Sequence, residues 1–314
     1  MNESPDDPQP VAAATPLVVG VSSSALFDLD DSDGVFRSQG IGEYRKYQEA
    51  RIDDALSPGI AFPFVRRLLS LNDLAPEPVV DVVVVSRNSP ETGQRVLRSA
   101  AKHGLPIVRS CFLDGEAPYP YMTAFGMSLF LTANEADVRA AVGMDQPAGQ
   151  VLPGHYEDNL ADPQLRIAFD FDGVLADDES EKVFATGGLQ AFESFEEAHA
   201  HLPHQPGLLK PLLVGINRIQ ALEEAAATQD STYERRVIVS LVTARGIPAH
   251  ERALYSLRAW GLTVNQAFFL GGHAKAPILQ TMQPHLFFDD QLRHLVDAST
   301  DVPSVHVPFG LRNA

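Results

Sequence analysis

The segment Ile167-Ala168-Phe169-Asp170-Phe171-Asp172-Gly173-Val174-Leu175 carries the strongest structural signal in this chain. Its apolar beginning predicts a buried strand, and Gly173 predicts a turn directly after it. Because side chains alternate along a strand, Asp170 and Asp172 are expected to project the same way where the strand ends. Two carboxylates this close require a cation between them, a shared proton or different roles. We therefore place the chemistry of the protein at this strand end.

The composition limits the kinds of partner that the protein can have. The chain has 314 residues, 45% hydrophobic and 21% charged, which is enough for two domains or one large α/β unit. Its formal charge of −17 argues against a nucleic acid polymer or an anionic membrane as partner, but allows a small phosphorylated ligand. The single cysteine, Cys111, excludes an internal disulfide and favours a reducing, cytoplasmic location.

Residues 1–16 are predicted to form a disordered tail. They are rich in Pro, Asp and Ala, and they have neither the basic start nor the apolar core of a signal peptide. No apolar run in the sequence approaches the ~20 residues that a membrane-spanning helix needs. We therefore expect no association with a membrane, whereas the composition leaves a homo-oligomer open.

The sequence repeats itself at long range. The segment from Phe36 to Tyr44 resembles the one from Phe184 to Phe192, and later Leu129-Phe130 matches Leu286-Phe287. The offset between the copies grows from 148 to 157 residues, so the second copy carries nine extra residues, which we place around 223–234. These ordered matches indicate an internal duplication. The two halves, 17–150 and 160–314, are expected to meet near 145–162.

Each half follows the same plan of alternating strands and helices. Strands are predicted at 17–21, 79–85 and 129–131, and again at 165–169, 237–242 and 286–288. Helices are predicted at 43–49, 61–72 and 92–103, and again at 190–199, 208–224 and 249–260. This alternation predicts an α/β fold of two tandem Rossmann-like halves with parallel sheets. Ligands of such sheets bind at the carboxyl ends of the strands.

In the second half, polar residues follow the predicted strands. Besides the first two aspartates, these are Thr243, Lys275, Asp289 and Asp290. Four carboxylates, a hydroxyl and an ammonium group in one crevice suit phosphoryl transfer from a small ester. The carboxylates offer the oxygen ligands that Mg²⁺ prefers, and one aspartate can attack phosphorus. A neighbouring carboxyl group can act as general acid and base, while the hydroxyl and ammonium groups hold the phosphoryl oxygens.

The four motifs in this order resemble the haloacid dehalogenase-like hydrolase superfamily. More narrowly, nearly the whole chain after residue 16 is similar to the cytosolic 5′-nucleotidase I family. That resemblance is carried by VSSSALF (21–27), YRKYQ (44–48), DESE (178–181), LVTAR (241–245), LRAWG (257–261), PHLFFDDQ (284–291) and HVPFG (306–310). The family usually has Asp-Gly-Asp-Ala-Val at the first motif, where this chain has Asp-Phe-Asp-Gly-Val; both acids are kept.

The resemblance implies a role for each site residue. Asp170 would be the nucleophile and Asp172 the general acid and base. Thr243, Ala244, Arg245 and Lys275 would bind the substrate or its phosphoryl group. Mg²⁺ would be held by Asp170, Asp172 through its backbone carbonyl, Asp289 and Asp290. The implied reaction is hydrolysis of a nucleoside 5′-monophosphate, such as AMP or a deoxynucleotide, to nucleoside and phosphate, beneath a helical cap at about 178–236.

Several alternatives stay open. Arg245 could contact substrate or form a surface salt bridge. Phe184, Phe192 and Phe195 could stack on a base or belong to the core. The same mechanism could serve a sugar phosphate or another small metabolite, and a retired hydrolase fold could serve only as a nucleotide-binding regulatory protein.

The first half lacks the residues that the chemistry needs. Asp170 and Asp172 correspond to Ser22 and Ser24, Thr243 to Ser86, Lys275 to Pro118, and Asp289 with Asp290 to Thr132 and Ala133. A seryl hydroxyl cannot replace a carboxylate as nucleophile and metal ligand, so we expect this half to be catalytically inactive. Its loops at 86–89 and 133–135 could bind a nucleotide, an effector or a partner subunit, or could be polar turns of a structural platform.

Overall fold

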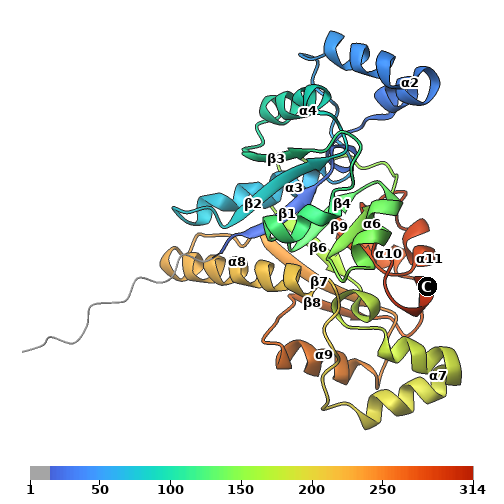
Figure 1. Ribbon diagram of the computed structural model, residues 1–314. Helices are drawn as coiled ribbons and strands as arrows, with labels where there is room; N and C mark the ends of the chain where they lie inside the picture. The colour runs from blue at the N-terminus through green and yellow to red at the C-terminus, as the bar shows by residue number, and fades with distance from the viewer. Residues whose placement is uncertain (1–14, 314) are drawn as a thin grey trace, which may run out of the picture.

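The computed structural model describes residues 15–313, so most of the predicted tail at 1–16 lies outside the described residues. The described chain is a mixed α/β fold built on one sheet of ten mostly parallel strands, with helices packed around it (Figure 1). The predicted α/β class is therefore confirmed. No helix among the described residues is both long enough and apolar enough to cross a lipid bilayer.

The first five strands form one side of the sheet, in the order β3-β2-β1-β4-β5. They are β1 (Leu17–Val21), β2 (Val80–Ser86), β3 (Arg109–Phe112), β4 (Leu129–Thr132) and β5 (Ala148–Val151). Their helices are α1 (Ser23–Leu26), α2 (Asp30–Ala50), α3 (Phe62–Ser70), η1 (Leu71–Leu74), α4 (Pro90–Lys102), η2 (Tyr119–Tyr121), α5 (Met122–Phe125) and α6 (Glu135–Val142). The β-branched run in β2 is buried, as expected for a strand of a parallel sheet with covered faces.

The last five strands form the other side, in the order β10-β9-β6-β7-β8. They are β6 (Leu165–Phe169), β7 (Val237–Thr243), β8 (Gln266–Phe269), β9 (Leu286–Asp289) and β10 (Ser304–His306). Their helices are η3 (Phe171–Leu175), α7 (Glu179–Ala198), α8 (Lys210–Gln229), α9 (His250–Ala259), α10 (Ala276–Met282), α11 (Leu292–Val296) and η4 (Leu311–Asn313). The two sides have the same strand order. From each outer edge inward, the strands are the third, second, first, fourth and fifth of that half of the chain.

The two sides join into one continuous sheet through β5 and β10. These strands are antiparallel, with Val305 opposite Val151 and His306 opposite Gln150, whereas every other pair in the sheet is parallel. The region at 145–162, where the halves were expected to meet, therefore contains a strand of the shared sheet.

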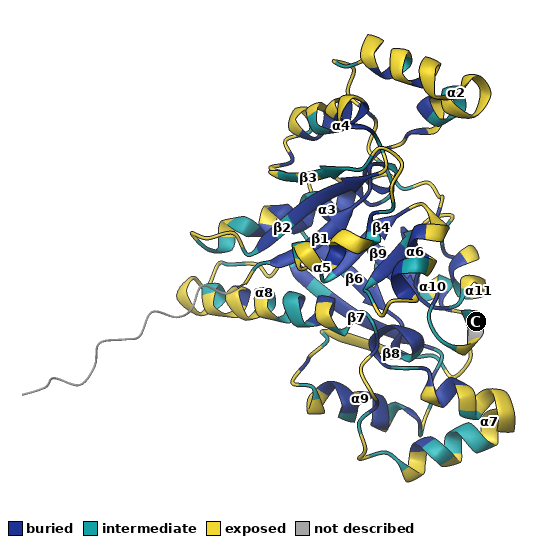
Figure 2. Cartoon of the chain, in the orientation of Figure 1, coloured by how far each residue is buried: buried dark blue, intermediate teal, exposed yellow. Residues whose placement is uncertain are grey.

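Helices α2 and α7 extend from opposite ends of the molecule (Figure 1), and both are largely exposed (Figure 2). Each is broken by a glycine in the left-handed region, Gly40 at φ 81° and Gly188 at φ 72°, where other residues would be strained. By contrast, α8 packs against β1 and β7 and buries Leu212, Leu213 and Ile216. Of the segment 178–236, therefore, α7 projects and α8 covers the sheet.

Candidate active site

The carboxyl ends of β6 and β9 place three acidic residues side by side. Phe169 pairs with Phe288, and their rings stack with centroids 5.2 Å apart. Asp170 follows β6 directly and donates its backbone N–H to the Phe288 carbonyl at 2.8 Å. Asp289 ends β9, and Asp290 comes next. The sheet ladder therefore fixes this part of the predicted site.

Lys275 joins two of these acids. Its Nζ lies 2.9 Å from Asp170 Oδ2 and 2.7 Å from Asp289 Oδ2, and all three residues are buried. Burial opposes the charge on Lys275, but the two carboxylates outweigh it and raise its pKa to about 12. Burial raises the pKa of Asp170 to about 6, against the lowering effect of Lys275. The other carboxylate oxygen of Asp170, Oδ1, accepts the Phe171 backbone N–H at 2.7 Å.

Asp289 has further partners in the loop that follows β9. Its Oδ1 accepts the Gln291 backbone N–H at 2.8 Å, and its Oδ2 lies 3.1 Å from His294 Nδ1. Burial would raise the pKa of Asp289, yet Lys275 and His294 together hold it below its usual value. His294 was not predicted as a site residue, and the signal that could have found it is its place in α11, five residues after Asp289.

Asp290 is the unusual member of the group. It is fully buried, and neither of its carboxylate oxygens has a hydrogen-bond partner. Burial, reinforced by the neighbouring charges of Asp170, Asp289 and Glu181, raises its pKa to about 10. Gly173 makes room for it: a Cβ there would lie 2.7 Å from Asp290 Cγ, and the φ of 71° also favours glycine.

These residues fit a hard divalent cation. One ligand atom each from Asp170, Asp289 and His294 lies within 4.8 Å of the others, and the unpartnered oxygens of Asp290 belong to the same strand end. A buried carboxylate without a partner is costly unless a cation or a proton compensates it. The donor set is rich in carboxylate oxygen, which favours Mg²⁺ or Ca²⁺ over soft metals.

Asp172 is held apart from this group by Arg245. Arg245 Nη2 lies 2.6 Å from Asp172 Oδ1, and Nε donates to Oδ2 at 2.7 Å. Arg245 is buried, so it forms an internal ion pair rather than the surface salt bridge considered from the sequence. Thr243, also buried, accepts the Arg245 backbone N–H at 3.2 Å, and the Ala244 carbonyl accepts the N–H of Gly272 at 2.8 Å.

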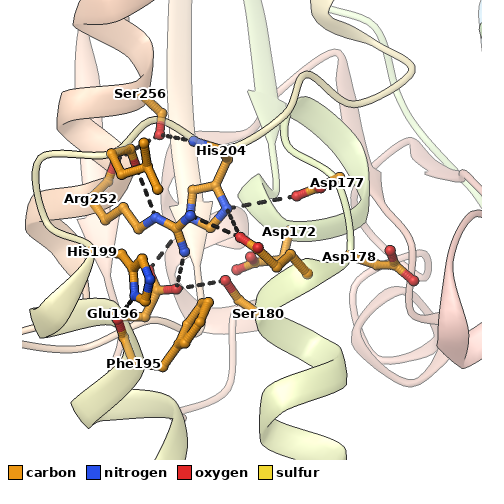
Figure 3. Close-up of polar contacts among 12 residues, drawn as sticks. Asp172, Asp177, Asp178, Ser180, Phe195, Glu196, His199, His204, Arg252 and Ser256 are labelled. Atoms are coloured by element: carbon orange, nitrogen blue, oxygen red, sulfur yellow. Dashed lines mark hydrogen bonds and ion pairs between the residues drawn. The ribbon is translucent and has the colours of Figure 1, made fainter.

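A buried polar cluster anchors α7 to the rest of the site (Figure 3). We call it the Glu196 cluster, and it comprises Ser180, Glu196, His204, Arg245 and Arg252. Glu196 accepts from Ser180 Oγ at 2.6 Å and from Arg252 Nη1 at 3.0 Å, pairs with Arg245, and lies 3.5 Å from His204. Glu196, His204 and Arg252 carry no signal in the sequence, because they come from α7, the loop after it and α9, and meet only when these segments pack together.

The charges in the Glu196 cluster reinforce one another. Burial would raise the pKa of Glu196, but the His204 hydrogen bond, the Arg245 charge and the Ser180 hydroxyl hold it well below its usual range. Burial would lower the pKa of His204, but Asp177 and Glu196 outweigh that effect and raise it. Arg245 thus contacts Asp172 on one side and α7 on the other.

The three candidate base-stacking aromatics lie on α7 and are not part of the core. Phe184 is 41% exposed and meets Phe192 edge to face, with ring centroids 6.2 Å apart. The Arg245 guanidinium lies 5.4 Å from the Phe192 ring centroid, and Arg252 lies 5.2 Å from that of Phe195. Phe184 and Phe192 therefore offer a partly open aromatic surface above the arginine that holds Asp172.

Comparison with known proteins now identifies the group to which this site belongs. A family model described as 5′-nucleotidase matches residues 9–314. The chain belongs to the 5′-nucleotidase family. It is 33% identical over 308 residues to cytosolic 5′-nucleotidase 1B of Homo sapiens, covering 95% of this chain and 49% of that protein. The resemblance to the cytosolic 5′-nucleotidase I family is thereby confirmed, although the chain spans only about half the length of this relative. No solved structure matches the chain.

Proposed function

We propose that this member of the 5′-nucleotidase family is a Mg²⁺-dependent phosphoric monoester hydrolase that converts nucleoside 5′-monophosphates, AMP-like or deoxynucleotides, to nucleoside and phosphate. The observation that supports this most directly is the buried group of Asp170, Lys275, Asp289 and Asp290 at the ends of β6 and β9. It combines a nucleophile, Asp170, a cation held between two carboxylates, Lys275, and a buried carboxyl group without a hydrogen-bond partner, Asp290. The family and its human relative, a cytosolic 5′-nucleotidase, favour a nucleotide as substrate and the cytoplasm as location.

The chemistry would proceed in two steps. An oxygen of Asp170 attacks phosphorus and forms an aspartyl-phosphate, while the bond from phosphorus to the nucleoside 5′-oxygen breaks. Asp172 gives its proton to the leaving oxygen, then takes one from the water that hydrolyses the aspartyl-phosphate. Thr243, the Ala244 N–H and Lys275 bind the phosphoryl oxygens. Mg²⁺, held by Asp170, Asp289, Asp290 and the Asp172 carbonyl, would offset the negative charge of the phosphoryl group.

This scheme requires the site to open. Asp170, Thr243 and Lys275 are each at most 4% exposed, and Asp172 is paired with Arg245. We propose that α7 moves to admit the substrate, because α7 carries Glu196, the second partner of the arginine that holds Asp172. We therefore propose α7 alone as the cap within 178–236 and assign α8 to the scaffold. A closing cap excludes water and contacts the substrate beyond its phosphate.

We further propose that the two halves arose by duplication and that the first is catalytically inactive. Two observations support the duplication: the strand order is the same in both halves, and α2 and α7 are each interrupted by a glycine, Gly40 and Gly188. Ser22 and Ser24 follow β1, where Asp170 and Asp172 follow β6, so the first half lacks a carboxylate nucleophile. The second half alone would perform hydrolysis.

A phosphate-release screen tests the proposed function. The protein is incubated with nucleoside 5′-monophosphates and with sugar phosphates, in Mg²⁺ and in EDTA. We expect release from at least one nucleoside monophosphate in Mg²⁺ and none in EDTA. Turnover of sugar phosphates alone would overturn the nucleotide assignment, and binding of nucleotides without any release would favour a regulatory protein.

A further inference from the structure

The first half contains a cavity at the carboxyl ends of β1, β2 and β4, the place that the acidic site occupies in the second half. Its volume is about 640 Å³. The buried end is lined by the side chains of Ser22, Ser86 and Thr132, and the open end by Phe36 and Ile41 of α2, which are 49% and 52% exposed. The cavity thus has a hydroxyl-rich interior and an apolar mouth.

The interior forms a wall of neutral hydroxyl groups. Ser22 Oγ and Ser24 Oγ are 3.0 Å apart, and Ser23 Oγ lies 2.9 Å from Ser86 Oγ. Thr132 Oγ1 accepts the backbone N–H of Asn134 at 3.1 Å. Since a hydroxyl can turn its hydrogen towards an acceptor, these groups can donate to an anionic oxygen placed between them. The four positions that correspond to the carboxylates of the second half carry no acidic side chain here.

The charged residues that line the cavity are largely matched. Arg87 donates from Nε to Asp137 Oδ2 at 3.0 Å, and Asp114 lies 3.6 Å from Arg45. The other lining charges, Arg37 and Asp33, belong to α2 near the mouth. An anion that enters the interior therefore contacts hydroxyl groups and Arg87, which Asp137 holds in place, rather than an unpaired carboxylate.

Helix α2 supplies an aromatic pair at the mouth, the exposed Phe36 and the buried Tyr44. The rings of Phe36 and Tyr44 meet edge to face with centroids 5.8 Å apart. The Tyr44 hydroxyl donates to Asn88 Oδ1 at 3.1 Å, which fixes α2 to the loop after β2. Aromatic side chains of this kind bind nucleobases by stacking, with little preference among them.

We propose that this cavity binds a nucleoside phosphate without metal and without hydrolysing it. The phosphate would lie against the hydroxyls of Ser22, Ser24 and Ser86, and the base against Phe36 and Tyr44. The strand ends carry hydroxyl groups where the second half has carboxylates, and the lining Asp137 is paired with Arg87, so this end needs no cation to accept a phosphate dianion. It also offers no nucleophile comparable with Asp170. This inference rests on the first half alone, so it stands or falls separately from the hydrolysis proposed for the second.

Equilibrium dialysis with AMP in EDTA tests the proposal on the full chain. Ser24→Asp places at the partly exposed Ser24 the acid that the second half has at Asp172, and Ser24→Asn is its uncharged control of equal size. Both variants lose the Ser24 hydroxyl, but only Ser24→Asp adds a negative charge, so we expect Ser24→Asp to bind AMP without metal at least about tenfold more weakly than Ser24→Asn. Phosphate release in Mg²⁺ is measured on the same samples, to report separately on the second half.

A second pair of variants guards against misfolding of Ser24→Asp. Phe36→Ala removes the exposed ring at the mouth, and Val108→Ala, at an 87% exposed site elsewhere in the first half, is its control. We expect only Phe36→Ala to weaken AMP binding in EDTA, by about three- to tenfold. Absence of AMP binding in EDTA, or binding that neither Ser24→Asp nor Phe36→Ala weakens, would overturn the proposal even if phosphate release is intact.

Discussion

Arg245 forms a bidentate ion pair with Asp172, with Nη2 2.6 Å from Oδ1 and Nε 2.7 Å from Oδ2. A planar guanidinium fixes the orientation of a carboxylate in a way that an ammonium group cannot. Because the same arginine binds Glu196 of α7, the orientation of the proposed general acid depends on the position of α7.

Arg245→Lys is expected to lower kcat about ten- to a hundredfold while KM changes less than about threefold, because the charge stays but the two-point contact is lost. Steady-state phosphate release with AMP measures both constants. Arg235→Lys, at an exposed position, is the control. A large rise in KM at constant kcat would instead indicate that Arg245 binds substrate directly.

Asp170→Asn is expected to reduce phosphate release more than about a thousandfold, because an amide is a poor nucleophile for phosphorus. The matched control is Ser22→Ala, which removes the corresponding side chain of the first half and the cap of α1, at a cost of about 1 kcal/mol in stability. Circular dichroism verifies folding of both variants. Complete loss of release in a folded Ser22→Ala variant would contradict the assignment of an inactive first half.

Asp290→Asn should abolish stabilisation by Mg²⁺. In the wild type we expect Mg²⁺ at a hundred times its Kd to add about 2.7 kcal/mol to the free energy of unfolding, and EDTA to remove this gain. Without Mg²⁺, Asp290→Asn should be no less stable than the wild type, since it removes a buried carboxyl group without partners. Thermal unfolding measures both effects, and the exposed Asp297→Asn is the control. An equal Mg²⁺ response in all three proteins would remove Asp290 from the metal site.

Glu196→Gln should change how stability depends on pH. Glu196 has its pKa lowered by folding, so its contribution is complete above its ordinary value of 4.5 and is lost progressively as the pH falls below that value. At pH 7 we expect Glu196→Gln to lose roughly 3–5 kcal/mol, because Arg245 and Arg252 lose a buried partner. Urea unfolding at pH 7 and pH 3 should show a smaller difference from wild type at pH 3. The exposed neighbour, Glu197→Gln, should match the wild type at both pH values.

Phe184→Ala should raise KM for nucleotides about three- to tenfold and leave a small substrate such as glycerol phosphate unaffected, if the ring stacks on a base. Leu222→Ala, at a similarly exposed position on α8, serves as control. Equal effects on both substrates would assign Phe184 to the stability of the cap rather than to base recognition.

The sequence predicted the central strands well because each is a buried apolar run. The run at 165–169 coincides with β6, and the predicted 79–85 and 237–242 lie within a residue of β2 and β7. The same reasoning could not find β5 or β10. They are only four and three residues long, and the pairing between them joins the two halves of the chain.

The site residues that could be predicted from the sequence are those that directly follow a strand. Asp170 and Asp289 meet at Lys275 because neighbouring parallel strands end together. The pairing of Asp172 with Arg245 depends instead on the conformation of η3, with Gly173 at φ 71°, and on the packing of α7. Contacts of this kind between distant segments leave no periodic pattern in a sequence.

The antiparallel pairing of β5 and β10 determines where small molecules enter and leave the two halves. Because the strands on its two sides run in opposite directions, the loops after β1, β2 and β4 open at one margin of the sheet, and those after β6, β7 and β9 at the other. A molecule released at one margin therefore has to travel around the sheet to reach the other. Any influence of one mouth on the other has to pass through the contacts that join the two sides, which include the seam of Val305 with Val151 and the packing of α8 against β1.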